Sequence, residues 1–363
     1  MNARAFRAPV TMPALAAWLA TTGLPIAACA EAREPDKFLQ QYVPVDQADL
    51  AKINAGQPVA KVLGTSEKRE VAVCGIVRVD VPIEFFLEQY QDIVNFKKNP
   101  AVKQIGKFGF PPRAEDLRQL ALEPGELDAF RKCKAGVCRV KMSAGMMARL
   151  RNEVDWRSPD RRERSSRLFR DMLASYVRSY TETGNAALMT YDDQDWQTNL
   201  ANEFSGLLKE SPYLLEYAPQ FYEYLARFPE LRIPCVESFI YWSKEDVGLR
   251  FVVSATHVMI YKALRDGRVW YFIVSKQIYA SHYFEGSLGL TVLVTRSKES
   301  PGSGFWMMYF NRSRADGLRG WLAGVKRSLV LLRLPSSMRE HIKLVKERLE
   351  LRYRAQRASG SVR

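Results

Sequence analysis

The sequence contains few of the residues that most often bind metals or carry out catalysis. Its 363 residues include three histidines and five cysteines, with no Cys-x-x-Cys motif and no second pair of Cys or His at metal-ligand spacing. It also lacks a glycine-rich phosphate-binding loop and a Gly-x-Ser-x-Gly nucleophile elbow. We therefore expect no metal site and no cofactor, and the enzyme classes built on these motifs are excluded.

Long apolar runs are confined to the N-terminus. Arg4 and Arg7 precede an uncharged apolar stretch that ends at Ala28, and small residues follow, which is the layout of a secretory signal. The four residues that end at Cys29 also match a bacterial lipobox, whose cysteine becomes the lipid-modified N-terminus. Soluble cleavage after Ala28 or Ala30 is the alternative. The sequence thus predicts an exported protein, either periplasmic or anchored to the envelope membrane through Cys29.

The remaining cysteines are consistent with an oxidising compartment. Cys133 and Cys138 are separated by Lys-Ala-Gly-Val, in which Gly136 provides a turn that brings the two Cβ atoms together. A local disulfide is therefore expected, and two free thiols in a helical region are the alternative. Cys74 and Cys235 lie on predicted strands, and the sequence leaves open whether they are buried thiols or partners.

Basic residues are in excess, mainly at the C-terminus. The chain has 54 Lys and Arg against 40 Asp and Glu, and Arg312 to Arg363 contains 14 Lys and Arg against four acidic residues. A solvated helix face is one interpretation. The other is attraction of the basic C-terminal helix to an anionic membrane surface, at roughly 1 kcal/mol per basic residue. Nucleic acid is not expected as a partner, because no binding motif for it is present and the export signal argues against it.

The C-terminal part of the chain predicts a sheet. Its segments are rich in β-branched and aromatic residues and are bounded by Gly, Asp, Ser and Pro, as strands are. Their succession with short connections predicts an antiparallel meander. The expected strands are Val236–Trp242, Phe251–Tyr261, Val269–His282, Leu288–Thr295 and Phe305–Asn311.

A long amphipathic helix is predicted after these strands. Pro335 interrupts it, and Ser337 with Glu340 offers a capping box that restarts it. We expect its apolar face to be buried across the sheet. The apolar residues at helical spacing are Leu318, Trp321, Leu322, Val325, Leu329 and Leu332, followed by Met338, Ile342, Val345 and Leu349.

An earlier strand and helix are separated from this region by a long helical stretch. The sequence from Val71 to Val79 alternates as a strand does, and Asp80-Val81-Pro82 predicts the start of a helix. Residues 99–232 are predicted to be mostly helical, because their main segments, from Ala114 to Phe228, lack strand alternation and are separated by Gly or Pro.

This order of elements resembles the START-like helix-grip superfamily, also called SRPBCC. The resemblance is carried by Val71–Tyr90 and Phe305–Leu349. It implies an α+β fold in which a curved antiparallel sheet grips a long C-terminal helix, here with a large helical insertion after the first strand-helix unit. It also implies a hydrophobic ligand, often a lipid or polyketide, between the sheet and that helix. The expected segments are a signal peptide (1–28), an N-terminal segment (29–70), the first strand and helix (71–98), the helical insertion (99–232), the sheet and C-terminal helix (233–351) and a basic tail (352–363).

Strand alternation predicts which side chains would line such a pocket. They come from one face of the second and last meander strands and from the facing part of the helix, and an ordinary packed core is the alternative. The predicted ligand-binding residues are Phe251, Val253, His257, Met259, Tyr261, Trp306, Met308, Phe310, Trp321, Leu322 and Val325.

The histidines give only weak catalytic candidates. His257 lies among apolar residues and is interpreted as a core or pocket-edge histidine. His282 lies close in sequence to Glu285, and a histidine with a carboxylate can act as an acid-base pair; an exposed turn is the alternative. His341 is expected to face the solvent.

Three functions follow from these observations. The first is an exported protein that binds a hydrophobic small molecule, possibly a lipid, near the envelope membrane. The second is an enzyme of the cyclase or hydrolase type that uses His257 or His282. The third is a structural or partner-binding envelope protein, with the helical insertion as its interaction surface.

Overall fold

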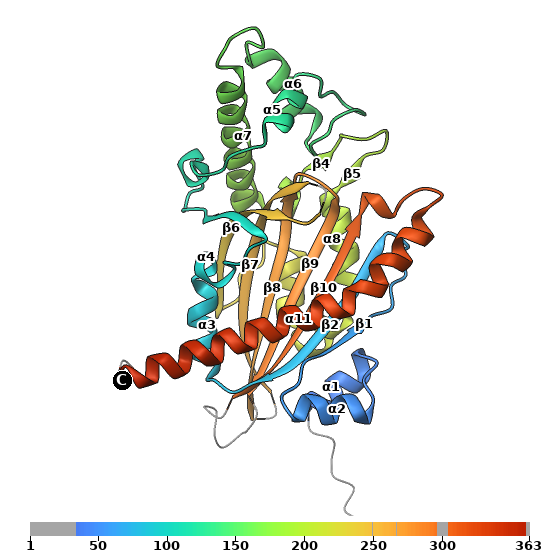
Figure 1. Cartoon of the computed structure of the whole chain (residues 1–363), viewed down its shortest axis with the longest axis vertical. Coiled ribbons are helices and arrows are strands. Elements are labelled where there is room, and N and C mark those ends of the chain that lie inside the picture. Colours follow the sequence, from blue (N-terminus) through green and yellow to red (C-terminus); the bar gives the residue numbers. More distant parts are fainter. Residues whose placement is uncertain (1–33, 249, 266, 296–303, 361–363) are drawn as a thin grey trace, which may run out of the picture. The chain divides into compact units, whose positions relative to one another are not determined.

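The computed structural model describes residues 34–248, 250–265, 267–295 and 304–360. The predicted signal peptide and the predicted lipid-attachment residue Cys29 lie outside these residues. The described part is α+β, with an eight-stranded antiparallel sheet and a long C-terminal helix (Figure 1). The predicted fold class is confirmed at this level.

The sheet has the strand order β1-β2-β10-β9-β8-β7-β6-β3, and neighbouring strands are antiparallel. The predicted first strand, β2 (Glu70–Val79), pairs along its whole length with the last strand. The expected meander of consecutive strands is present and consists of β6 (Val236–Asp246), β7 (Phe251–Arg265), β8 (Arg268–Ala280), β9 (Phe284–Thr295) and β10 (Phe305–Ala315).

The two edge strands of the sheet, β1 and β3, were not predicted from the sequence. β1 (Val59–Val62) lies in the N-terminal segment (29–70), for which no strand was predicted, and β3 (Val102–Lys107) lies in the region predicted to be mostly helical. β3 pairs with β6 and has no fully buried side chain. A short, polar edge strand shows little of the hydrophobic alternation that identifies a buried strand, so β3 was not recognised within the region predicted to be mostly helical.

Helices cover both faces of the sheet. In Figure 1, α3 (Ile83–Gln91), α4 (Ile93–Phe96) and α11 (Ala323–Ala358) lie in front of the sheet, and α8 (Leu200–Lys209) lies behind it. The remaining α-helices are α1 (Glu34–Tyr42), α2 (Gln47–Asn54), α5 (Pro124–Phe130), α6 (Ala144–Glu153), α7 (Arg161–Thr183), α9 (Pro212–Tyr217) and α10 (Pro219–Ala226). The short elements are the strands β4 (Thr190–Tyr191) and β5 (Thr198–Asn199) and the 3-10 helices η1 (Ala114–Leu117), η2 (Gly184–Ala187) and η3 (Asp316–Leu318).

Each face of the sheet has its own hydrophobic core. Successive side chains of a strand point to opposite faces. Thus Met307 packs with the α3 and α11 residues Phe86 and Ile342, whereas its neighbour Met308 belongs to the core beneath α7 to α10. Because both faces are covered, both alternating sets of strand residues are apolar over much of their length. We refer to the side of α3, α4 and α11 as the front face and to the other side as the back face.

The second half of α11 packs on the front face as predicted. Met338, Ile342, Val345 and Leu349 are buried against the sheet. A Cβ atom on Gly75 of β2 would lie 2.8 Å from Cγ of Met338, so only glycine permits this approach of helix and strand. α11 is one continuous helix with Pro335 inside it, and the expected restart at Ser337 does not occur.

The first half of α11 does not pack as predicted. Val325, Leu329 and Leu332, expected on the sheet, are exposed. Among the described helices, none has the length and apolar character needed to cross a membrane.

A buried ion-pair network joins the upper end of the sheet to α8. The Glu70 carboxylate accepts hydrogen bonds from Arg312 at 2.6 Å and from Arg314 at 3.1 Å. Arg314 also donates to Glu203 of α8 at 2.9 Å. All four side chains are mostly buried, and removing one partner from such a network leaves an uncompensated buried charge.

Candidate functional site

The front face of the sheet changes from apolar to polar along its strands. On β10, Met307 is followed two residues later by Tyr309 and then by Asn311, and on β8, Ile273 is followed by Ser275. The registers place the polar positions of neighbouring strands side by side, because Asn311 pairs with Gly289 and Gly289 pairs with Ser275. The lower half of this face is thus hydrophobic, and the upper half presents hydroxyl and amide groups.

A cavity of about 150 Å³ lies over the boundary between these halves. Phe86 and Tyr90 of α3, Met307 of β10, and Ile342 and Val345 of α11 form part of its wall. Pro82 directly precedes α3, where a proline is tolerated because the first helical N–H groups have no intrahelical partner. The predicted helix start therefore positions one wall of the cavity.

A second hollow of about 180 Å³ continues over the polar half of the front face. Ser254, Thr256, Gln277, Ser287 and Asn311 supply polar groups to its lining. The two spaces share four lining residues, which are Lys97, Tyr241, Ser275 and Tyr309. We call the combined space the front groove.

Lys97 and Glu245 provide a charged pair at the front groove. Nζ of Lys97 lies 2.7 Å from Oε1 of Glu245 and 3.2 Å from Oη of Tyr241. Burial acts to lower the pKa of Lys97, but Tyr241 and Glu245 outweigh it and hold that pKa above its ordinary value. Burial likewise acts to raise the pKa of Glu245, but Lys97 outweighs it and holds the pKa below its usual range. Both groups are therefore ionised at neutral pH.

Hydrogen bonds hold several of the uncharged polar groups of the groove in place. Oη of Tyr90 lies 3.2 Å from Oγ of Ser275, and Oγ of Ser313 donates to Oδ1 of Asn311 at 2.9 Å. The exposed ring of His341 lies 5.9 Å from the ring of Tyr309, measured between centroids. These groups can donate and accept hydrogen bonds, as recognition of a polar ligand group requires.

The structure does not bring the predicted ligand-binding residues together. Trp321, Leu322 and Val325 are exposed and form no wall of the groove. The strand residues Val253, Met259, Tyr261, Trp306, Met308 and Phe310 lie in or against the back-face core. Alternation correctly separated the two sets of side chains on each strand, but the set predicted to lie beneath the C-terminal helix is the one on the back face. The groove residues Tyr309, Asn311, Ser275 and Thr256 were missed, although their period-two spacing was visible in the sequence.

His257 is a buried histidine of the back face. It is 3% exposed, and its Nδ1 lies 3.0 Å from Oη of Tyr180. Burial is the main cause that lowers the pKa of His257 to about 3, and the nearby Lys276 lowers it further. Burial also holds the pKa of Lys276 well below its ordinary value. His257 is thus neutral at physiological pH, and its surroundings are those of a core residue.

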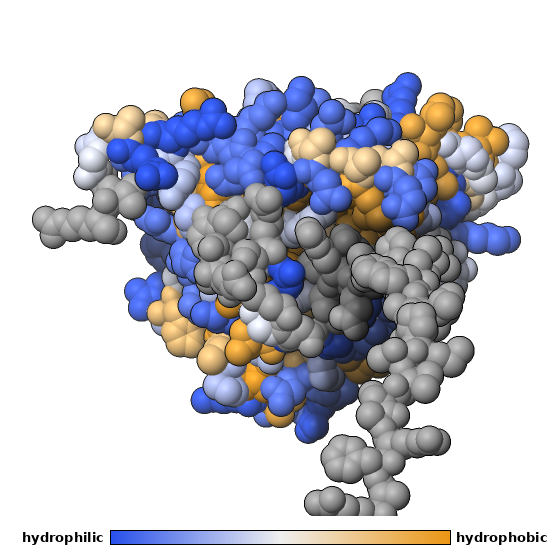
Figure 2. Space-filling view, turned by 90° about the horizontal axis from the view of Figure 1, so that it is seen from below, coloured by the Kyte–Doolittle hydropathy of each residue, from blue (hydrophilic) through white to orange (hydrophobic). Residues whose placement is uncertain are grey.

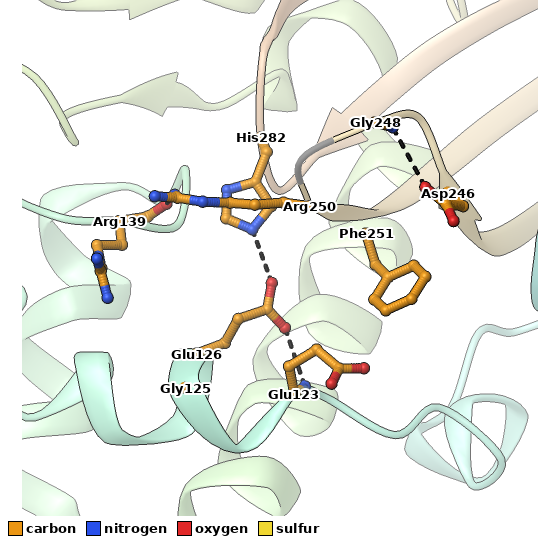
Figure 3. A pocket seen from close by; sticks show the side chains of 9 residues that line it. All are labelled: Glu123, Gly125, Glu126, Arg139, Asp246, Gly248, Arg250, Phe251 and His282. Atoms are coloured by element: carbon orange, nitrogen blue, oxygen red, sulfur yellow. Dashed lines mark hydrogen bonds and ion pairs between the residues drawn. The ribbon is translucent and has the colours of Figure 1, made fainter.

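His282 lies at a different pocket and pairs with a residue other than the predicted one. Its Nε2 lies 2.7 Å from Oε1 of Glu126 of α5, and Figure 3 shows the two side chains pointing toward each other. The pocket has a volume of about 330 Å³, and Phe251 and Arg250 also line it. Phe251, predicted to bind a ligand beneath the C-terminal helix, therefore lies at this separate site.

Glu285 is part of the buried ion-pair network. Its carboxylate accepts hydrogen bonds from Arg69, from Arg319 at 2.7 Å and from Trp196 at 3.2 Å. Burial acts to raise its pKa, but Arg319 and Arg69 outweigh it and hold the pKa of Glu285 below its usual range. A carboxylate held in this way fixes the start of α11 and is not available to His282.

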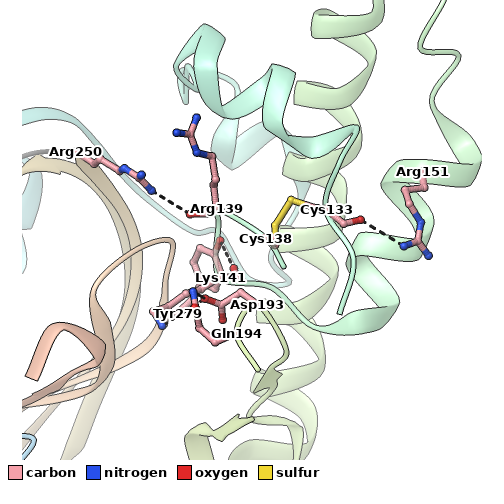
Figure 4. Close-up of a disulfide and its surroundings, with 9 residues drawn as sticks. All are labelled: Cys133, Cys138, Arg139, Lys141, Arg151, Asp193, Gln194, Arg250 and Tyr279. Carbon is pink, nitrogen blue, oxygen red and sulfur yellow. Dashed lines mark hydrogen bonds and ion pairs between the residues drawn. A yellow bond between two sulfur atoms is a disulfide. The ribbon is translucent and has the colours of Figure 1, made fainter. Parts of the chain in front are cut away.

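The disulfide between Cys133 and Cys138 is present, as predicted (Figure 4). It lies between α5 and α6 and closes a turn with positive φ at Gly136. Cys74 is buried and Cys235 is exposed, and both are free thiols. Within the described residues, no group of three His, Cys, Asp or Glu side chains is arranged to hold a metal ion.

Comparisons of this protein with protein-family models, with curated proteins and with solved structures find no match. The front groove and the pocket at His282 are therefore interpreted from their own geometry and chemistry.

Proposed function

We propose that the protein is exported and binds an amphiphilic molecule, such as a lipid, in the front groove. The observation that carries this proposal is the continuity of the apolar cavity with the polar hollow through Lys97, Tyr241, Ser275 and Tyr309. An apolar chain would occupy the cavity beside Phe86, and a polar group would lie over the hydroxyl and amide side chains. The N-terminal layout of charged, apolar and small residues supports the export part of the proposal.

The position of α11 supports a helix-grip arrangement as part of the same proposal. In this view the sheet curves around the second half of α11, as in START-like proteins, and the segment between β3 and β6 is an insertion. The chain order of β2, α3, α4, β3, the meander and α11 is consistent with it. The ligand would then lie between the sheet and the last helix, as the resemblance implies.

The size of the cavity sets the scale of the expected affinity. A space of about 150 Å³ is comparable with cavities that hold a benzene ring, or about six carbon atoms. At about 0.8 kcal/mol per buried CH₂ group, filling it contributes roughly 5 kcal/mol. This corresponds to about 4,000-fold in affinity, so blocking the cavity should weaken binding strongly.

Displacement of a fluorescent fatty-acid analogue, together with native mass spectrometry of the purified protein, tests this proposal. Ser275→Phe places a ring at the junction of cavity and hollow and is expected to weaken binding more than a hundredfold. Val345→Phe fills the same cavity from α11 and should act alike. Ser238→Phe is the matched control, because Ser238 is an exposed β6 residue away from the groove.

Equal binding by Ser275→Phe, Val345→Phe and Ser238→Phe would overturn the proposal. Urea unfolding of each variant shows whether the fold is retained. Because the two cavity variants change different elements, agreement between them excludes a local folding defect as the cause.

A second candidate function is acid-base catalysis at His282. The hydrogen bond from His282 to Glu126 fixes the imidazole orientation beside a pocket of about 330 Å³, as general-base catalysis requires. His282→Gln should abolish hydrolysis of an ester or lactone substrate while leaving binding in the front groove unchanged. Hydrolysis that is unaffected by His282→Gln would rule out this role.

A further inference from the structure

Apolar side chains cover the outer surface of the first half of α11. Val325, Leu329 and Leu332 are 60%, 58% and 79% exposed, and Trp321, just before the helix, is 92% exposed. Val325, Leu329 and Leu332 are spaced i, i+4 and i+7, which places them on one side of the helix. We call these four residues the outer stripe. Large apolar patches of this kind on a protein surface mark interaction sites.

The inward side of the same helical turns combines half-buried Leu331 and Leu334 with one charged side chain, Arg327. Nη2 of Arg327 donates to Oγ1 of Thr65 at 2.8 Å, and its Nε donates to the backbone oxygen of Glu70 at 3.4 Å. A surface helix normally buries its apolar face and exposes its charges. Here Arg327 and the half-buried Leu331 and Leu334 hold the helix to the protein, and the outer stripe faces away. The orientation is therefore fixed by specific contacts.

Basic residues accompany the outer stripe without acidic ones. Five Lys or Arg and no Asp or Glu occur between Asp316 and Glu340. Lys326 and Arg333 are exposed and lie beside the stripe at helical spacing. In the view from below, α11 runs along the upper edge, and hydrophobic surface gathers towards its right-hand end among hydrophilic side chains (Figure 2). The surface is thus apolar and positively charged.

We propose that the outer stripe docks on an anionic phospholipid surface. An amphipathic helix lies in the plane of the headgroups, inserts its apolar side chains shallowly and places basic residues near the phosphates. Trp321 at the start of the stripe is the residue type preferred at that depth. A second copy of the chain fits less well, because it would bring Lys326 and Arg333 against the same charges.

Co-sedimentation of the full chain with vesicles tests this docking. Vesicles of phosphatidylcholine with phosphatidylglycerol are compared with vesicles of phosphatidylcholine alone. Removing two cations by Lys326→Gln with Arg333→Gln should weaken binding to the anionic vesicles about 25-fold, since each cation near the surface contributes about fivefold. Leu329→Ser with Leu332→Ser should weaken it at least tenfold through lost insertion.

The matched control is Leu351→Ser with Arg354→Gln in the second half of α11. Leu351 is 70% exposed, and the Arg354 side chain is 78% exposed, so this pair removes one leucine and one cation from the same helix outside the stripe. All variants keep the same N-terminal segment, which then contributes equally. Unchanged urea midpoints verify the fold, because the substituted side chains are exposed.

Three outcomes would overturn the proposal. The first is equal vesicle binding by the stripe and control variants. The second is equal binding of the unchanged protein to anionic and neutral vesicles. The third is a concentration-dependent dimer in analytical ultracentrifugation that Leu329→Ser with Leu332→Ser abolishes, since the stripe would then be a self-association surface.

Discussion

Replacing His257 with glutamine is expected to flatten the pH dependence of stability between pH 7 and pH 5. The imidazole is 3% exposed and has a pKa of about 3 in the folded protein, lowered first by burial and second by Lys276. In the unfolded chain its pKa is near 6.5. Between these values the unfolded state binds a proton that the folded state does not, so stability falls as the pH falls.

The size of this effect follows from the two pKa values. One unit of pKa difference corresponds to 1.36 kcal/mol. Between pH 7 and pH 5 the unfolded imidazole becomes almost fully protonated while His257 in the folded protein stays neutral. The free energy of unfolding should therefore fall by about 2 kcal/mol through this residue alone. His257→Gln keeps a polar side chain near Tyr180 but removes the titrating group, so this contribution should vanish.

Urea unfolding followed by circular dichroism at pH 7 and pH 5 measures the difference. This window suits the test because the pKa values of Glu245 and Glu285 lie below the usual carboxyl range and these groups stay ionised. Tyr180→Phe is the control, because it removes the hydrogen bond to Nδ1 but leaves the buried imidazole, and it should keep the pH dependence of the unchanged protein. If His257→Gln loses as much stability at pH 5 as the unchanged protein, His257 is not a buried neutral group.

Three further stability predictions use the same urea measurement at pH 7. Lys276→Met should raise the free energy of unfolding, because burial lowers the pKa of this amine and its contacts are the amide oxygen of Asn185 and the rings of Tyr180 and Phe204 instead of a carboxylate; an unchanged or lower value contradicts this. Gly75→Val should cost about 1–3 kcal/mol because its Cβ would lie 2.8 Å from α11, whereas Gly64→Val, with nothing within 4 Å of its Cβ, serves as the control. Glu70→Gln should cost about 3–5 kcal/mol by leaving two buried β10 arginines undercompensated, and a cost below 1 kcal/mol would show that the network is not needed.

The meander and the disulfide were predictable because their signals are local. Strand segments such as β7 and β8 have β-branched and aromatic residues between turn residues, and Gly136 lies between Cys133 and Cys138 in the sequence. Alternation did not predict which of the two sets of strand side chains points to the front face and which to the back face. Met307 and Met308 are both apolar and both buried, because helices cover each face, so a period of two separates the sets without assigning them to a side.

The candidate sites depend on contacts between distant residues. His282 was expected to act with nearby Glu285, but its partner is Glu126, 156 residues away in sequence. Glu126 follows Pro124 at the start of a helix and accepts a hydrogen bond from the backbone N–H of Glu123 in a capping box. The local sequence indicates this capping role but not the contact with His282. Similarly, apolar periodicity predicted that Val325 and Leu329 face inward, because the pattern does not reveal that Arg327 makes the inward contacts.

The second half of α11 takes part in the proposed ligand site, and the first half forms the proposed membrane-docking surface. After Pro335, Met338 and Ile342 pack on Gly75, and Ile342 forms one wall of the front groove. Before it, the outer stripe faces away from the protein. One continuous helix thus joins the proposed ligand site to the proposed membrane-docking surface, which would hold the groove close to a source of amphiphiles.

If this arrangement is correct, ligand binding in the front groove and vesicle binding by the outer stripe can be removed independently by mutation. Ser275→Phe should lose the fatty-acid analogue and keep vesicle binding, whereas Leu329→Ser with Leu332→Ser should show the reverse. If each change removed both properties, the docking and ligand sites would be a single surface, and the division of α11 at Pro335 would have no functional meaning.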